Sequence, residues 1–312
     1  DSGFFYSRYP EPKSLQSVED NVEGNDVKRG SETDSNLEMS VYFHKLGTKQ
    51  AEDIQIFKPT ENPKWLPRAT MSDDGKYLTI SISESTAPVN RVYISQVEQI
   101  LSGGWDDSKF VKLIDNFDAG YDYVTNTGSK FYFRTNKDAP RYKVICIDLE
   151  DAKEEKWIDI LPHKGEVLND VLCVGNKYLV ACYMNHAQET LSLFKLDDGS
   201  LVQQIPLPDV GSVGSLSGKR EHMEFFYSFV GFVHPGVKFR FDLETMQSYK
   251  LREDIVSNHR PEDFETKQVF YESKDGTKIP MFIVGKKGQK HSGNTCTLLY
   301  GYGGGGANIY PL

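Results

Sequence analysis

The chain has 312 residues, a formal net charge of −9 at pH 7 and a sequence pI near 5.4. A broad nucleic-acid footprint needs clustered lysine and arginine, so this acidic balance argues against a nucleic-acid partner. No run approaches the roughly 18 consecutive apolar residues of a membrane span, so we expect no membrane partner either. Hydrophobic residues make up 38% of the chain, enough to bury a core, and 12% aromatic residues favour β-sheet.

We expect no targeting signal at the start of the given sequence. Residues 1–12 have neither a basic start nor a following apolar run, which is not the pattern of a signal peptide. They also lack an initiating methionine and open within a strand-like pattern. We therefore expect a fragment of a longer protein.

Two kinds of strand-like segment alternate along the chain. The first kind opens on small or turn-forming residues and continues as an aromatic-rich strand, at 2–9, 72–83, 127–136, 174–185 and 217–229. The second kind is an alternating strand that closes on a polar turn, at 37–47, 90–98, 141–150, 189–199 and 236–245. Equivalent positions recur every 46 to 52 residues, at Phe43, Tyr93, Ile145, Leu193 and Phe239. This period predicts five visible blades of a β-propeller; the alternative is an all-β sandwich with accidental spacing.

Turn residues support these strands. Asp74-Gly75 and Asp198-Gly199 lie between apolar runs, where an Asp-Gly pair supplies the positive φ of a hairpin turn. Asn176-Lys177 is expected to form a similar turn. Helical periodicity is scarce, and only a piece near Val97–Leu101 predicts a turn or two of helix.

Two segments inside the repeats differ from the strand and turn pattern. Residues 10–36 are polar and charged, and we interpret them as a mobile insertion within the first visible blade. Residues 211–218 (GSVGSLSG) superficially resemble a phosphate-binding loop. They lack the Lys-Ser/Thr ending and a following helix, so we predict an inter-blade loop.

The cysteines and histidines show no metal-binding spacing. Cys146, Cys173, Cys182 and Cys296 lie in or beside apolar strand-like runs, and no C-x-x-C pair occurs. We expect buried, reduced thiols in a cytoplasmic protein without a metal or cofactor. Seven histidines are expected to be surface or loop residues, namely His44, His163, His186, His222, His234, His259 and His291.

The blade pattern ends near residues 257–261. Residues 266–287 then predict a β-hairpin that turns at Asp275-Gly276. Residues 295–304 read as an apolar strand running into glycines, which is where α/β sheets place their ligand-binding loops. We expect the start of a second domain that this chain does not finish.

These segments resemble one family along the whole chain, in order. The run VFYESKDGTKIPMFIV followed by LLYGYGG is similar to the start of the hydrolase domain in the prolyl oligopeptidase family. Residues 71–93, 111–148 and the SETDSN segment before VYFHKLG resemble its propeller blades. The resemblance implies a mainly β chain: an incomplete seven-bladed propeller over residues 1–258, then the first strands of an α/β-hydrolase domain over 259–312.

The resemblance also implies a function for the complete protein. Family members are serine endopeptidases that hydrolyse short, proline-containing peptides on the carboxyl side of proline, and a propeller restricts access to the site. We expect the complete protein to be a monomer. The family's Ser–His–Asp triad lies well beyond LYGYGG, so it would fall past Leu312 and the chain alone would be inactive.

One catalytic contribution is implied within the chain. Tyr302, the second tyrosine of LYGYGG, would donate its hydroxyl to the oxyanion of the tetrahedral intermediate, whereas Tyr300 would point to the other face of the strand and into the core. The family continues with a phenylalanine that lines the proline pocket. If Gly305 takes that position, one wall of the pocket is absent; alternatively, Asn308-Ile309 is the family's Asn-Ile displaced by an insertion.

Two rival functions remain open. A non-catalytic propeller could bind peptide or protein partners, but the blades lack Gly-His and Trp-Asp signatures and the tail from Thr266 onwards would have no purpose. A related propeller peptidase could instead cleave after basic residues or remove acylated amino acids. Whichever function holds, an incomplete propeller exposes unpaired strand edges. We therefore expect the isolated chain to self-associate.

Overall fold

The computed structural model describes residues 2–10, 36–290, 292–302 and 311. The chain divides into two compact units, one formed by residues 1–138 with 146–158 and the other by residues 139–145 with 159–312. Most of the polar insertion, His291, Gly305 and Asn308-Ile309 lie outside the described residues.

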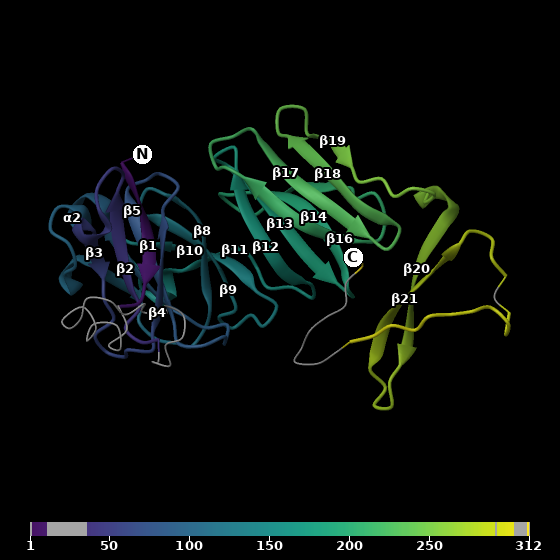
Figure 1. The fold of residues 1–312 in the computed structure, drawn as a ribbon, viewed down its shortest axis with the longest axis horizontal. Coiled ribbons are helices and arrows are strands. Elements are labelled where there is room, and N and C mark those ends of the chain that lie inside the picture. The colour runs from purple at the N-terminus through teal and green to yellow at the C-terminus, as the bar shows by residue number, and fades with distance from the viewer. Residues whose placement is uncertain (1, 11–35, 291, 303–310, 312) are drawn as a thin grey trace, which may run out of the picture. The chain divides into compact units, whose positions relative to one another are not determined.

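Each visible repeat forms one β-meander, in which strands adjacent in sequence are adjacent in the sheet (Figure 1). The first sheet has three strands, β1 (Gly3–Arg8), β2 (Ser40–Lys45) and β3 (Ile54–Phe57). The second sheet comprises β4 (Leu66–Met71), β5 (Tyr77–Ser83), β6 (Arg91–Gln96) and β7 (Val111–Ile114). The third comprises β8 (Tyr121–Thr127), β9 (Lys130–Thr135), β10 (Lys143–Asp148) and β11 (Ile158–Leu161).

Two more four-stranded sheets and a hairpin follow in the second unit. The fourth sheet comprises β12 (Val167–Val174), β13 (Tyr178–Asn185), β14 (Gln188–Lys195) and β15 (Leu201–Ile205). The fifth comprises β16 (Ser212–Gly218), β17 (Glu224–Gly231), β18 (His234–Asp242) and β19 (Gln247–Glu253), and the hairpin comprises β20 (Phe264–Glu272) and β21 (Lys278–Lys286). The five propeller sheets predicted from the 46- to 52-residue period are confirmed, and the sandwich alternative is wrong.

Helical structure is as sparse as predicted. The α-helix α2 (Val97–Leu101) is confirmed. Single 3-10 turns are η1 (Gln50–Glu52), η2 (Asp107–Lys109), η3 (Glu154–Lys156) and η4 (Pro261–Asp263).

A β-bulge recurs in the first strand of the third, fourth and fifth sheets. The register with the next strand shifts between Tyr123 and Thr125 in β8, between Leu168 and Asp170 in β12, and between Val213 and Ser215 in β16. A bulge adds one unpaired residue and increases the local twist of the strand. The repeats therefore share a local distortion as well as a strand order.

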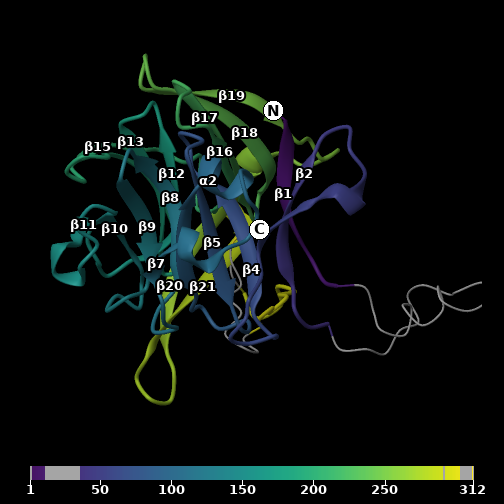
Figure 2. The same ribbon diagram turned by 90° about the vertical axis from the view of Figure 1, so that its left-hand side faces the viewer.

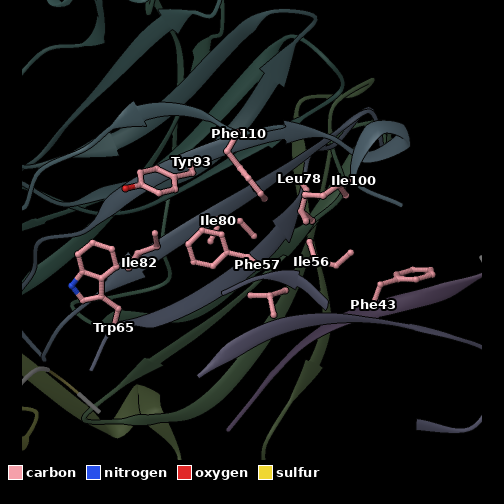
Figure 3. Packing of buried hydrophobic residues seen from close by; sticks show 11 residues of the cluster. Phe43, Ile56, Phe57, Trp65, Leu78, Ile80, Ile82, Tyr93, Ile100 and Phe110 are labelled. Carbon is pink, nitrogen blue, oxygen red and sulfur yellow. The ribbon is translucent and has the colours of Figure 1, made fainter. Parts of the chain in front are cut away.

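The core of the first unit lies between its first two sheets. In β5, Leu78, Ile80 and Ile82 are fully buried, as expected for one face of an alternating strand. Phe57 meets Tyr93 and Phe110 edge-on, with ring centroids 6.0 and 5.5 Å apart, and Figure 3 shows these rings among the buried aliphatic side chains. β1 and β2 lie beside β4 (Figure 2).

The core of the second unit joins the fourth and fifth sheets. Apolar side chains from β13 and β14, among them Val180 and Leu193, pack with the aromatic face of β17 and β18. Phe225 stacks on Phe241, and Tyr227 stacks on Phe239, each pair with ring centroids 5.0 Å apart. A stacked aromatic pair contributes about 0.5–1.5 kcal/mol to the free energy of unfolding beyond the contribution of its buried apolar area.

The hairpin turns follow the predicted chemistry, with one shift. Gly75 and Gly199 have φ of 70° and 66°, so both Asp-Gly predictions are confirmed. In the third predicted turn, the positive φ angles fall on Gly175 and Asn176, one residue earlier than expected. The predicted inter-blade loop at 211–218 is wrong, because residues 212–218 form β16 and pair with β17. Cross-strand pairing overrides the weak strand propensity of its glycines and serines.

Candidate functional site

The hairpin after the last propeller sheet is regular and closes on the predicted turn. β20 and β21 pair in unbroken register from Phe264–Lys286 to Glu272–Lys278. Gly276 has a φ of 82°, and the Asp275 carboxylate accepts hydrogen bonds from the Ser273 hydroxyl and the Thr277 N–H. These bonds stabilise the charged carboxylate and lower the pKa of Asp275 to about 2.

The hairpin contacts the fourth and fifth sheets through a few side chains. Gln268 Nε2 donates to the carbonyl oxygen of His186, whose ring meets Phe270 edge-on at 4.9 Å. The ring centroid of Phe282 in β21 lies 5.4 Å from that of Phe232, which is in the turn between β17 and β18. Much apolar surface of the hairpin is nevertheless exposed, including Tyr271 at 50%.

The segment that carries Tyr302 does not form the expected strand. Residues 296–302 have no regular secondary structure, and Leu298, Leu299 and Tyr300 are 90%, 85% and 73% exposed. The prediction of Tyr300 as a core residue is therefore wrong for this structure. A buried strand needs partner strands on its edges, and within the described residues β20 and β21 pair only with each other.

Tyr302 itself is accessible. Its side chain is 64% exposed. A phenol in this state can donate a hydrogen bond to a ligand, as the proposed role requires. The catalytic assignment stays a prediction.

The histidine prediction needs correction at His234, which begins β18 with its side chain 17% exposed, and at His44. His44 lies on β2 with its side chain 20% exposed, and its Nδ1 atom lies 2.7 Å from Oδ1 of Asp53. The Tyr6 hydroxyl donates to the other carboxylate oxygen of Asp53 at 2.5 Å. The His44 ring also packs against Phe4 at 5.2 Å, so the arrangement ties β1 and β2 to the residue before β3. Residue types alone could not reveal this pair, because Asp53 meets His44 only through the β2–β3 pairing.

Other titratable groups do not form a metal site. Among the residues that the structure describes, no group of three or more His, Cys, Asp or Glu side chains could hold a metal ion. Cys146, Cys173 and Cys182 are buried thiols, as predicted, but Cys296 is exposed because the strand expected to bury it does not form. In the same described residues, no helix is long and apolar enough to cross a membrane.

Residues 1–254 match the family model for the N-terminal beta-propeller domain of prolyl oligopeptidase. This chain belongs to the prolyl oligopeptidase family. It is 35% identical to the dual function macrocyclase-peptidase POPB of Galerina marginata, over 99% of this chain and 40% of that protein. It is 33% identical to the prolyl endopeptidase of Elizabethkingia meningoseptica, over 100% of this chain and 40% of that protein.

A solved structure of the family shares the fold. Prolyl oligopeptidase B from Galerina marginata, in its apo form, superposes with a TM-score of 0.83 at 33% identity, covering 100% of this chain and 41% of that one. The same enzyme bound to a 35-residue hydrolysis and macrocyclization substrate superposes with a TM-score of 0.77. The chain thus spans about 40% of the length of the curated relatives it matches. The predicted family resemblance and the propeller fold are confirmed.

Proposed function

We propose that the complete protein is a prolyl oligopeptidase, a serine endopeptidase that cleaves short peptides on the carboxyl side of proline. The observation that carries this proposal is the collinear match of the whole chain to a macrocyclase-peptidase at 35% identity and to a prolyl endopeptidase at 33% identity. The match extends past the propeller domain at residue 254 into the hairpin and the LYGYGG segment. A propeller that served only as a binding module would not need those last elements.

We further propose a division of the chain at residues 258 and 259. Residues 1–258 would belong to the propeller that limits access to short peptides, and residues 259–312 would begin the hydrolase domain. Within the second part, Tyr302 would donate its hydroxyl to the oxyanion. A donor aimed at the charge that develops in the transition state contributes about 3–4 kcal/mol to catalysis.

The chain alone would be inactive. In the hydrolase fold the nucleophile lies on a sharp strand-to-helix turn in a G-x-S-x-G context, and this sequence contains no such element. An oxyanion donor without a nucleophile and base provides little rate enhancement. We also propose that the complete protein is a monomer and that it is cytoplasmic; the buried cysteine thiols support the second proposal, since they suit a reducing compartment.

A peptidase assay tests the proposal. The complete gene product should release a chromogenic group from a blocked Gly-Pro substrate, and the 312-residue chain should not. Tyr302→Phe in the complete protein should lower kcat about 10²- to 10³-fold, the usual cost of removing one oxyanion donor. Tyr300→Phe is the matched control and should stay near wild type.

Two results would contradict the proposal. A complete protein that binds but does not cleave proline peptides would favour the binding module, and cleavage after lysine or arginine would favour another propeller peptidase. Equal kcat values for the two tyrosine variants would remove Tyr302 from the catalytic machinery.

A further inference from the structure

A short linker joins the fifth sheet to the hairpin. Ile255 and Val256 are 89% and 51% exposed, and Asn258 adopts a left-handed φ of 62°. The His259 N–H donates to the Val256 carbonyl at 3.2 Å, which closes a tight turn. The linker buries little apolar surface of its own, so its position depends on the contacts of its last residues.

His259 contacts elements on both sides of this linker. Its Nε2 atom lies 2.8 Å from the carbonyl oxygen of Val233, in the turn between β17 and β18. Its ring lies 5.1 Å from that of Phe264, the first residue of β20, at an interplanar angle of 35°. Because a carbonyl oxygen only accepts, Nε2 must carry the proton. The neutral Nε2–H tautomer and the imidazolium can both donate, so the contact does not depend on the charge of the ring.

The β17–β18 turn that accepts this bond also contacts the hairpin. Its Phe232 ring packs on Phe282 of β21 at 5.4 Å. Beyond the linker, Arg260 makes two hydrogen bonds to the Asp263 carboxylate, at 2.9 and 2.8 Å. The Asp263 carbonyl in turn accepts from the Lys287 N–H, next to the end of β21, at 2.9 Å. The linker, the hairpin and the turn therefore form one cluster, and the His259 side chain contacts both the turn and β20.

We propose that His259 is a positioning residue that holds the hairpin against the β17–β18 turn of the last propeller sheet. This inference rests on the proposed function, because the hairpin precedes the segment of Tyr302 and its position would affect both peptide access and the placement of that tyrosine. Gln268 and Phe282 also join the hairpin to the sheets, and His259 adds one hydrogen bond and one ring contact. Loss of the hydrogen bond would shift the balance between held and released hairpin about three- to tenfold. A contact of this strength permits opening for substrate and closure before the reaction.

The kinetic test uses the complete protein with three substitutions. His259→Ala removes the donor, His259→Gln retains an N–H donor that can reach the carbonyl, and His163→Ala is the control at an exposed histidine between β11 and β12. For a short Gly-Pro substrate, His259→Ala should lower kcat about three- to tenfold with a smaller change in KM, because fewer molecules hold the hairpin in place. His259→Gln should recover most of this loss, and His163→Ala should show none.

Hydrogen–deuterium exchange gives a readout that does not depend on peptidase activity. In His259→Ala, residues 229–236 and 261–270 should exchange about three- to tenfold faster than in wild type. Unchanged exchange overturns the proposal, and so does faster exchange with unchanged kcat, which would leave His259 a purely stabilising role. If exchange accelerates as expected but the wild-type protein cleaves nothing after proline, the proposed function fails while the holding contact stands.

Discussion

The side-chain amide of Asn90 pairs with the backbone of Tyr121 as a neighbouring strand would. The Tyr121 N–H donates to Oδ1 of Asn90 at 2.7 Å, and Nδ2 of Asn90 donates to the Tyr121 carbonyl at 3.1 Å. Asn90 is only 8% exposed and precedes β6, whereas Tyr121 begins β8 of the next sheet. One side chain thus satisfies both backbone groups of Tyr121 and joins two successive sheets of the first unit.

Replacing Asn90 should therefore destabilise the propeller more than replacing an exposed asparagine does. Asn90→Ala leaves one donor and one acceptor of Tyr121 without partners in a buried place, so we expect a loss of about 2–4 kcal/mol in the free energy of unfolding. Urea denaturation followed by tryptophan fluorescence measures this change. Asn185→Ala, at an exposed end of β13, is the control and should cost less than about 0.5 kcal/mol. If both variants lose the same free energy of unfolding, the hydrogen bonds between Asn90 and Tyr121 do not contribute to stability.

Asp53 should make the first sheet sensitive to acid. Burial of its carboxyl, which is 1% exposed, would raise the pKa, but the hydrogen bonds from Tyr6 and His44 outweigh burial and hold the pKa below 3.8. A depressed folded-state pKa contributes stability that is complete above the unfolded-state value and is lost as the pH falls through the folded-state value. Asp53→Asn should therefore lower stability at neutral pH and flatten the decline in stability as the pH falls below about 5.

Unfolding curves at several pH values check the Asp53 prediction. Asp151→Asn, at an exposed turn, is the control and should follow the wild-type curve. If Asp53→Asn runs parallel to wild type throughout the acid range, the Asp53 carboxylate is not the group that loses its partners.

The four thiols should differ in reactivity. Burial raises the pKa of the Cys146 and Cys182 thiols, so their reactive thiolate forms are scarce, and Cys173 is buried as well. Cys296 is exposed. In the folded chain, 5,5′-dithiobis(2-nitrobenzoic acid) should react rapidly with Cys296 and slowly with the others, and all four thiols should react in guanidinium. Cys296→Ser should remove the rapid phase and Cys173→Ser should retain it; a rapid phase that survives Cys296→Ser would refute the burial pattern.

Two turn glycines should respond unequally to alanine. Gly75 and Gly199 have nearly the same left-handed φ, but a Cβ atom at Gly199 would collide with the Ile160 carbonyl oxygen, whereas one at Gly75 meets nothing within 4 Å. Gly75→Ala should cost about 1–2 kcal/mol, the penalty for a Cβ in this backbone region. Gly199→Ala adds the collision and should cost at least about 3 kcal/mol. Urea denaturation measures both, and equal losses would show that Ile160 can move aside.

The structural features that depend on neighbours along the chain could be predicted from the amino-acid sequence. The five blades, the Asp-Gly turns at Gly75 and Gly199 and the helix at 97–101 follow from it, and so does the hairpin, predicted at 266–287 and found at 264–286. A meander pairs each strand with the next one, so alternation and turn chemistry are sufficient to specify it. The family also followed from the sequence, because the resemblance is collinear over the whole chain.

The features that depend on distant partners could not be predicted from the sequence and became visible in the folded chain. The glycines and serines of 212–218 form a strand because β17 pairs with them. Residues 296–300 form no strand, although they are mostly apolar, because none of the described strands pairs with them. Likewise, Asp53 meets His44, Asn90 meets Tyr121 and His259 meets Val233 only after the strands have paired and packed. Strand propensity is a weak local preference, and hydrogen bonding to another segment outweighs it in either direction.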